Sequence, residues 1–195
     1  MRVSKETLRS HMEKDRYGDF LLTPAIRPAI SPKIIPVNGY RVAYNTGMLK
    51  FQISASREKI IGLFISLMKL TGKRPDVFLE VSNYNEERIV SSYLREGMER
   101  IVLESHIYGI EEILLGNGFV SIGIRGSTTE VCLDSHKLIS VYTNRPASTA
   151  RIIKRNGIPY IPSLEFFCEE AGHFHADFEG LMEGFLSFAR EIEAE

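Results

Sequence analysis

The C-terminal part of this sequence holds a dense group of potential metal ligands. One cysteine, two glutamates, two histidines and one aspartate fall within ten residues: Cys168, Glu169, Glu170, His173, His175 and Asp177. Thiolate, imidazole and carboxylate groups are the donors that zinc and other transition metals take from proteins. Metal binding is therefore the first chemistry to consider.

The local conformation decides which of these side chains share a side. In a helix, Glu169, His173 and Asp177 are spaced by four residues and project from the same side. In an extended segment, His173, His175 and Asp177 do so instead. Two interpretations stay open. Either the segment is a polar helix face with its cap and binds no cofactor, or a divalent metal is held by Glu169, His173, His175 and Asp177 and activates water for hydrolysis.

The residues His173-x-His175-x-Asp177 resemble part of the metal-binding signature of metallo-β-lactamase-type hydrolases. The resemblance implies metal-dependent hydrolysis. It covers only these few residues, because Phe178 stands where that signature has another histidine and no histidine or cysteine follows. A hydrolase-type enzyme is therefore the alternative function, and the sequence leaves open whether the protein is an enzyme.

A second candidate site is the segment 122–129, Ile-Gly-Ile-Arg-Gly-Ser-Thr-Thr. Glycines and hydroxyls can surround a phosphate with exposed N–H groups. The segment resembles the phosphate-binding hairpin of sugar kinases and actin-like ATPases, which implies a ligand near Arg125, Ser127 and Thr128. Arg125 lies where that family has an acidic residue. The other interpretation is a simple β-turn, since glycine and serine are common in turns.

Other reactive side chains lack a pattern typical of catalysis. His136 lies in a predicted turn and His106 between two predicted helices, so we expect both in loops. Cys132 lies in an alternating strand, and the acidic residues after Cys168 would oppose thiolate formation. No Gly-x-Ser-x-Gly sequence, the nucleophile motif of α/β-hydrolases, is present.

Alternating strands and helices must position these side chains. Apolar periodicity and turn residues predict strands at 40–44, 49–54, 76–82, 119–125, 129–133 and 138–143, and helices at 56–70, 86–104, 110–115, 144–156 and towards the C-terminus. We therefore predict a mixed α/β (α+β) fold in which residues 39–195 form a single domain. Its one mixed, largely antiparallel sheet combines an N-terminal hairpin, a central strand and a C-terminal three-stranded meander, flanked by helices.

Residues 1–38 are predicted to form an extended, proline-rich N-terminal arm. Proline recurs at every fourth position, and isoleucines lie between the prolines on the same side of an extended chain: Pro24, Ile26, Pro28, Ile30, Pro32, Ile34 and Pro36. This spacing excludes a helix. The arm has one apolar face, which either packs on its own domain or contacts a second copy of the chain.

Composition narrows the classes of function. The sequence has 24 basic and 25 acidic residues and a net charge of −1, which does not favour binding to nucleic acid. It has no apolar segment long enough to span a bilayer and no secretory signal, so we expect a cytoplasmic protein without a membrane partner. The favoured function is a non-catalytic interaction or small-molecule-binding module that forms a homo-oligomer.

Overall fold

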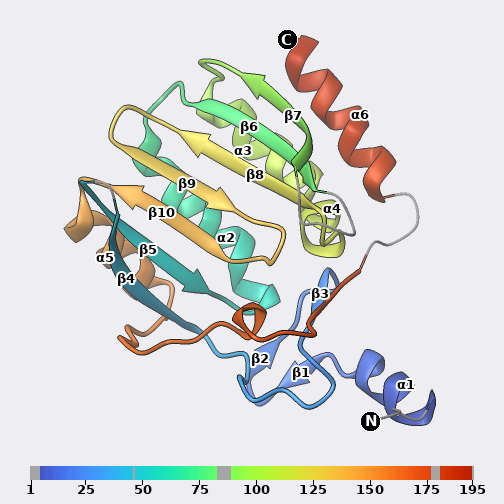
Figure 1. Ribbon diagram of the computed structural model, residues 1–195. Coiled ribbons are helices and arrows are strands. Elements are labelled where there is room, and N and C mark those ends of the chain that lie inside the picture. Colours follow the sequence, from blue (N-terminus) through green and yellow to red (C-terminus); the bar gives the residue numbers. More distant parts are fainter. Residues whose placement is uncertain (1–4, 46, 83–88, 177–180, 195) are drawn as a thin grey trace.

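A seven-stranded sheet forms the centre of the computed structural model (Figure 1), which describes residues 5–45, 47–82, 89–176 and 181–194. The strand order is β4-β5-β10-β9-β8-β6-β7, and every neighbouring pair is antiparallel. The strands are β4 (Gly39–Asn45), β5 (Met48–Ser54), β6 (Asp76–Ser82), β7 (Ile89–Arg95), β8 (Val120–Arg125), β9 (Thr129–Leu133) and β10 (Ile139–Thr143). The predicted mixed α/β class with a largely antiparallel sheet is confirmed.

Helices cover one face of this sheet, the face turned away from the viewer in Figure 1. They are α2 (Arg57–Met68) with the short 3₁₀ turn η1 (Lys69–Thr71), α3 (Arg100–Gly109), α4 (Glu111–Gly116), α5 (Pro146–Arg155) and α6 (Leu181–Ala194). Apolar residues surround much of α2, as in helices that are buried on most sides. Within the described ranges, no helix is long and apolar enough to cross a membrane.

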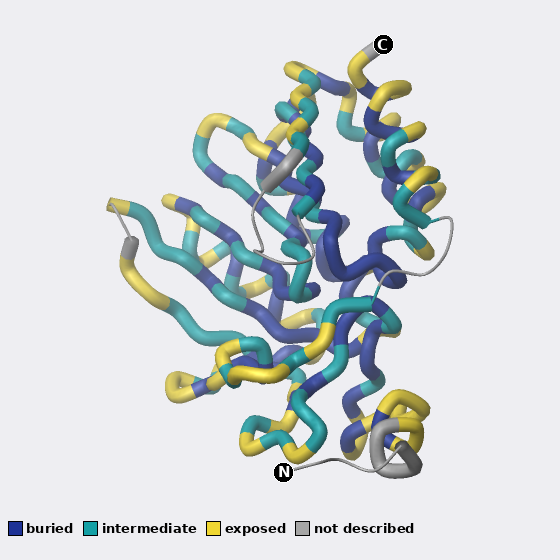
Figure 2. The backbone as a smooth tube through the Cα atoms, turned by 45° about the vertical axis from the view of Figure 1, so that its right-hand side comes forward, coloured by how far each residue is buried: buried dark blue, intermediate teal, exposed yellow. Residues whose placement is uncertain are grey.

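The core lies between the sheet and these helices. Alternation along the strands sends one set of side chains inward, where they are fully or almost fully buried: Val77, Leu79, Ile122, Ile124, Val131, Leu133, Ile139 and Val141. The residues between them on β6, β9 and β10 are half-buried and lie on the opposite face. Figure 2 shows this change from buried to partly exposed backbone across the molecule. The second face of the sheet is thus open over much of its area.

The predicted helix at 86–104 is wrong over residues 89–99: residues 89–95 form β7, and residues 96–99 connect it to the next helix. Val90 and Leu94 are four residues apart, a spacing that fits one side of a helix and equally one face of a strand. In the structure Leu94 pairs with Phe78 of β6 and is 55% exposed on the open face. The preceding residue of β7, Tyr93, lies on the other face of the strand and packs against the core. The helix that was expected here begins only at Arg100 as α3.

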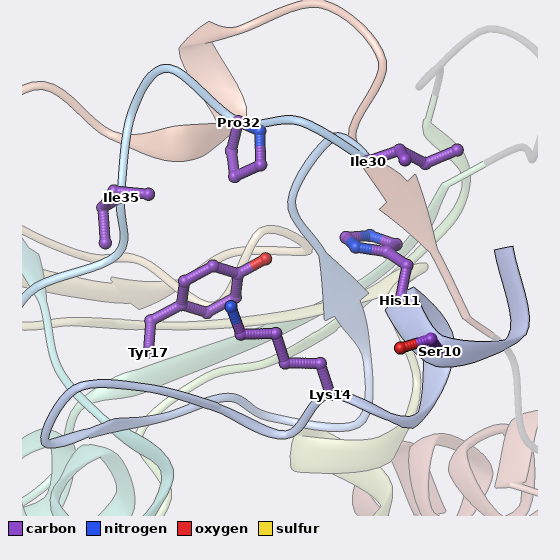
Figure 3. A pocket seen from close by; sticks show the side chains of 7 residues that line it. All are labelled: Ser10, His11, Lys14, Tyr17, Ile30, Pro32 and Ile35. Carbon is purple, nitrogen blue, oxygen red and sulfur yellow. The ribbon is translucent and has the colours of Figure 1, made fainter. Parts of the chain in front are cut away.

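The N-terminal region contains α1 (Lys5–Glu13) and three short strands, β1 (Arg16–Tyr17), β2 (Phe20–Leu21) and β3 (Ile26–Arg27). β3 pairs with β11 (Phe174–His175) from the C-terminal part of the chain, and Ile26 is 2% exposed. Figure 3 shows a hollow of about 640 Å³ between α1 and the proline-rich segment, towards which His11 and Tyr17 point. Residues 25–27 therefore pack on their own chain.

After α5 the chain returns across one end of the open face (Figure 1, orange). Tyr40 of β4 exchanges backbone hydrogen bonds with this segment, donating to Pro159 and accepting from Ile161. Further on, Leu164 and Phe166 pack on Leu138 beside β10, and a 3₁₀ turn η2 (Phe167–Glu169) follows. This path brings the histidine-containing residues 173–175 to the end of the central strands.

Candidate functional site

Three of the five histidines of the chain converge at one end of the sheet. His136 comes from the turn between β9 and β10, and His173 and His175 come from the segment that forms β11. One ring nitrogen from each residue lies within 4.8 Å of the others. The ring centroids are 4.9–5.3 Å apart, which makes a nearly equilateral triangle of imidazoles. We call these three residues the histidine cluster.

A tight turn holds His136 in place. The backbone N–H of Lys137 donates to the Asp134 carbonyl over 3.0 Å, and Lys137 has a φ of 61°. This combination, a four-residue turn followed by a residue in the left-handed region, is common in three-residue hairpin loops. The Asp134 carboxylate closes the turn by accepting a hydrogen bond from the Leu138 N–H at 2.9 Å. The backbone around His136 is therefore defined by local hydrogen bonds.

Lys137 adopts a conformation that usually favours glycine, because its side chain is tied down. Its Nζ donates to the Val120 carbonyl over 3.1 Å, and the residue is 4% exposed. Burial lowers the pKa of the Lys137 amine to about 7, against the opposing effect of the Asp134 charge. Burial likewise raises the pKa of the Asp134 carboxyl to about 6, against its backbone hydrogen bond and Lys137. Residues other than glycine rarely adopt this left-handed backbone conformation, and they keep it only where surrounding contacts stabilise it, as the buried hydrogen bond of Lys137 does.

Backbone pairing positions the other two histidines. His175 lies opposite Ile26 in the β11–β3 pair. The neighbouring Ala176 donates its N–H to the Ala25 carbonyl at 2.8 Å and accepts from the Gly118 N–H at 2.8 Å. Because residues two apart in an extended chain share a side, His173 and His175 project towards His136 together.

Backbone carbonyls orient both rings. His175 Nδ1 lies 2.5 Å from the Gly118 carbonyl oxygen, and His173 Nδ1 lies 3.1 Å from that of Glu170. A carbonyl only accepts hydrogen bonds, so each Nδ1 carries the hydrogen and the lone pair of the neutral ring is on Nε2. Phe119 stacks on the His175 ring with centroids 5.5 Å apart. Histidine ligands of metals are commonly held in this way, with the second nitrogen bound to a carbonyl or carboxylate.

The spacing of the cluster is somewhat wider than that of an occupied site. Zn–N bonds of 2.0–2.1 Å in a tetrahedron place ligand nitrogens about 3.4 Å apart. The nitrogens of the cluster are up to 4.8 Å apart, so each must move by about 1 Å, which small rotations of the imidazole rings provide. The three residues can then supply three ligands and leave the fourth position to solvent.

The structure does not place Glu169 in the histidine cluster. Its carboxylate binds Arg41 at 2.5 Å and accepts the Phe166 N–H at 3.0 Å. Partial burial tends to raise the pKa of Glu169, but the hydrogen bonds and charge of Arg41 outweigh it, so the pKa is below its usual value. Asp177, the fourth predicted ligand, lies outside the described residues. Sequence reasoning missed His136, because a single turn histidine carries no local sign of its distant neighbours.

Arg125, Ser127 and Thr128 line a groove of about 680 Å³ on the open face of the sheet. The groove extends to Asp134, the first residue of the turn that carries His136. The Arg125 side chain binds Glu130 at 2.7 Å and lies over the Phe78 ring, 5.1 Å from its centroid. Hydrogen bonding and charge from Glu130 raise the pKa of Arg125 further, so it remains protonated.

Comparison of the chain with protein-family models, with curated proteins and with solved structures finds no significant match. Arguments about its function therefore depend on the geometry of the two sites.

Proposed function

We propose that this protein binds one divalent transition-metal ion through Nε2 of His173 and His175 and one ring nitrogen of His136, and uses it to activate water for hydrolysis. The observation that carries the proposal is the convergence of three imidazoles, two of which are oriented by backbone carbonyls through Nδ1. Zinc suits a set of three imidazoles, and cobalt and nickel bind the same donors. Compared with the predicted ligands, the proposed set includes His136 and omits Glu169 and Asp177.

The number of ligands favours a catalytic role for the metal. Structural zinc sites are usually closed by four protein ligands, whereas catalytic sites have three and keep one position for water or substrate. All three histidines are half-buried, and Nε2 of His175 itself lies below the surface. A metal at such a position lowers the pKa of bound water to about 7 and supplies hydroxide at neutral pH. The chain's own part is to hold the three rings and to fix the tautomers of His173 and His175.

Metal binding can be measured with untagged protein. We expect one zinc ion per chain in elemental analysis after dialysis against zinc, and a cobalt(II) visible absorption spectrum typical of four-coordinate sites. Replacing His136, His173 or His175 by alanine should weaken zinc binding by at least about a hundredfold, because each substitution removes a ligand. His106→Ala is the matched control, since His106 is also half-buried but lies on α3. Stoichiometric zinc binding by His136→Ala would contradict the proposal.

Hydrolysis needs a separate assay. With zinc bound, we expect metal-dependent cleavage of p-nitrophenyl acetate or bis-p-nitrophenyl phosphate that is lost in His136→Ala and retained in His106→Ala. Tight zinc binding without any such activity would support the proposed metal site but refute the proposal that the metal catalyses hydrolysis.

Self-association is a second candidate function, because apolar side chains of the proline-rich segment are exposed. Ile35 is 47% and Val37 is 40% exposed. We expect the double variant Ile35→Ser, Val37→Ser to shift an oligomer towards monomer in light scattering. An unchanged mass would remove the arm from the interface.

A further inference from the structure

The cross-strand registers define two rows of side chains over the centre of the open face. One row runs across six strands as Leu94, Phe78, Gly123, Cys132, Ser140 and Gln52. The neighbouring row contains Asp76, Arg125, Glu130, Tyr142 and Lys50. The groove of about 680 Å³ is lined by residues of both rows, among them Cys132 and Ser140 of the first and Glu130 and Tyr142 of the second.

Small side chains form the floor of the groove and aromatic rings flank it. Cys132 and Ser140 are adjacent in the first row and line the groove. The Phe78 ring occupies the space directly above Gly123, where a Cβ atom would lie 1.9 Å from the ring. Tyr142 stands on the other side of the floor, next to Ser140 on β10. Phe78 and Tyr142 are thus the two aromatic side chains that line the groove.

Both aromatic rings already bind a cation of the protein itself. The Arg125 guanidinium lies 5.1 Å from the Phe78 centroid, and Lys50 Nζ lies 5.2 Å from the Tyr142 centroid. Faces of aromatic rings attract cations, and more strongly when water is excluded. Both aromatic side chains of the groove thus already contact a positively charged side chain.

Three carboxylates surround the floor. The Cys132 thiol donates a hydrogen bond to Glu130 at 3.6 Å. Burial raises the pKa of this thiol most, and the negative charges of Glu130, Glu80 and Asp134 raise it further, so the thiol stays protonated. Glu130 is balanced by its ion pair with Arg125. Burial and the nearby Glu130 raise the pKa of Glu80, which means that a positive charge placed beside Glu80 is electrostatically favourable.

We propose that this groove is a binding site for a small organic cation: a flat apolar body lies between Phe78 and Tyr142, and a primary ammonium lies between Glu80 and Asp134. Aromatic walls, a few directed polar groups and a volume of 300–1,000 Å³ are usual for small-molecule sites, and about 680 Å³ falls within that range. The site is formed by β5, β6 and β8–β10 and requires no metal. This proposal can therefore be tested independently of metal binding by the histidine cluster.

Three probes with the same ring and different charge test the proposal: 2-phenylethylamine, 2-phenylethanol and phenylacetate. In titration calorimetry with a chelator present, we expect the amine to bind at least about tenfold more tightly than the neutral alcohol or the anion. Equal or tighter binding of the alcohol or of phenylacetate would overturn the proposal. So would the absence of amine binding at millimolar concentration.

Variants locate the bound cation. Glu80→Gln and Asp134→Asn should each weaken amine binding by about tenfold, whereas Glu193→Gln, on the exposed side of α6, should leave it unchanged. Since the pKa of Glu80 is raised in the folded state, its ionised form opposes folding at neutral pH, and Glu80→Gln should melt at a slightly higher temperature. Weaker binding by a more stable protein excludes unfolding as the cause. Unchanged binding in both variants would refute the site.

If Asp134→Asn fails to fold, Tyr142→Leu takes its place. The leucine keeps an apolar wall but removes the aromatic ring beside the flat body, which the amine and the alcohol share, so binding of both probes should weaken by a similar factor. Unchanged binding of both probes would show that Tyr142 is not a wall of the site, and would count against the proposal.

Discussion

Single atoms decide the orientation of the histidine cluster. The Gly118 carbonyl oxygen accepts a hydrogen bond from Nδ1 of His175. This contact requires the backbone at Gly118 to lie close to the segment that carries His175. A Cβ at position 118 would lie 2.4 Å from the Ala25 carbonyl oxygen and 3.1 Å from the His175 Cβ. Main-chain atoms cannot move aside easily. Glycine at this position is therefore needed for the ring geometry as well as for packing.

Gly118→Ala should damage both the fold and the metal site. We expect the free energy of unfolding to fall by about 1–3 kcal/mol, as for other overpacked positions, and zinc affinity to fall by about 10–100-fold because His175 loses its support. Urea unfolding and zinc titration measure the two effects. Gly109→Ala is the matched control, since nothing lies within 4 Å of a Cβ at that position. Wild-type zinc affinity in Gly118→Ala would show that the Gly118 contact does not orient the ligand.

At the scale of elements, one segment controls the position of two of the three histidines. Residues 159–169 cross the end of the open face and are held there by backbone bonds to Tyr40 and by the Arg41–Glu169 ion pair. Arg41 also donates to the Leu164 carbonyl at 2.8 Å and lies 4.6 Å from the Phe166 ring centroid. These contacts of residues 159–169 thus place β11 beside the β9–β10 turn.

Glu169→Gln separates the two roles that Glu169 can have. Its carboxylate is held by Arg41, so we expect unchanged zinc affinity and a loss of about 0.5–1 kcal/mol of stability at pH 7, small because both side chains are partly exposed to solvent. The pKa of Glu169 is lowered in the folded state, so its contribution is present above pH 4.5 and lost as the pH falls below it. The stability difference from wild type should disappear in acid. A large loss of zinc affinity would instead make Glu169 a ligand, as the sequence predicts.

At the scale of the whole molecule, the histidine cluster joins parts of the chain that are far apart in sequence. The β9–β10 turn belongs to the central sheet, whereas β11 is paired with β3 of the N-terminal region. A metal bound to the cluster would link the sheet to both terminal regions. Because such a site exists only in the folded chain, the free energy of metal binding adds to the free energy of folding.

Zinc should therefore raise the melting temperature. At a free zinc concentration a hundredfold above the dissociation constant, the folded state gains about 2.7 kcal/mol, which corresponds to about 5–10 °C for a chain of this size. Calorimetry with zinc and with chelator measures the shift. His136→Ala should show no shift, and an equal shift in that variant would indicate that zinc binds elsewhere.

The sequence by itself determined the alternation of the central strands and the buried character of α2, because these depend on periods of two and 3.6 residues within one element. It left open whether His173 shares a side with His175 or with Glu169, since this depends on whether the segment is extended or helical. It did not determine β7, since a spacing of four residues fits a strand as well as a helix. Nor did it bring His136 to the other histidines or Glu169 to Arg41. Those contacts depend on strand order and on the path of residues 159–175 across the sheet, which arise from packing between elements distant in sequence. Only the tertiary structure could therefore assemble the candidate metal centre.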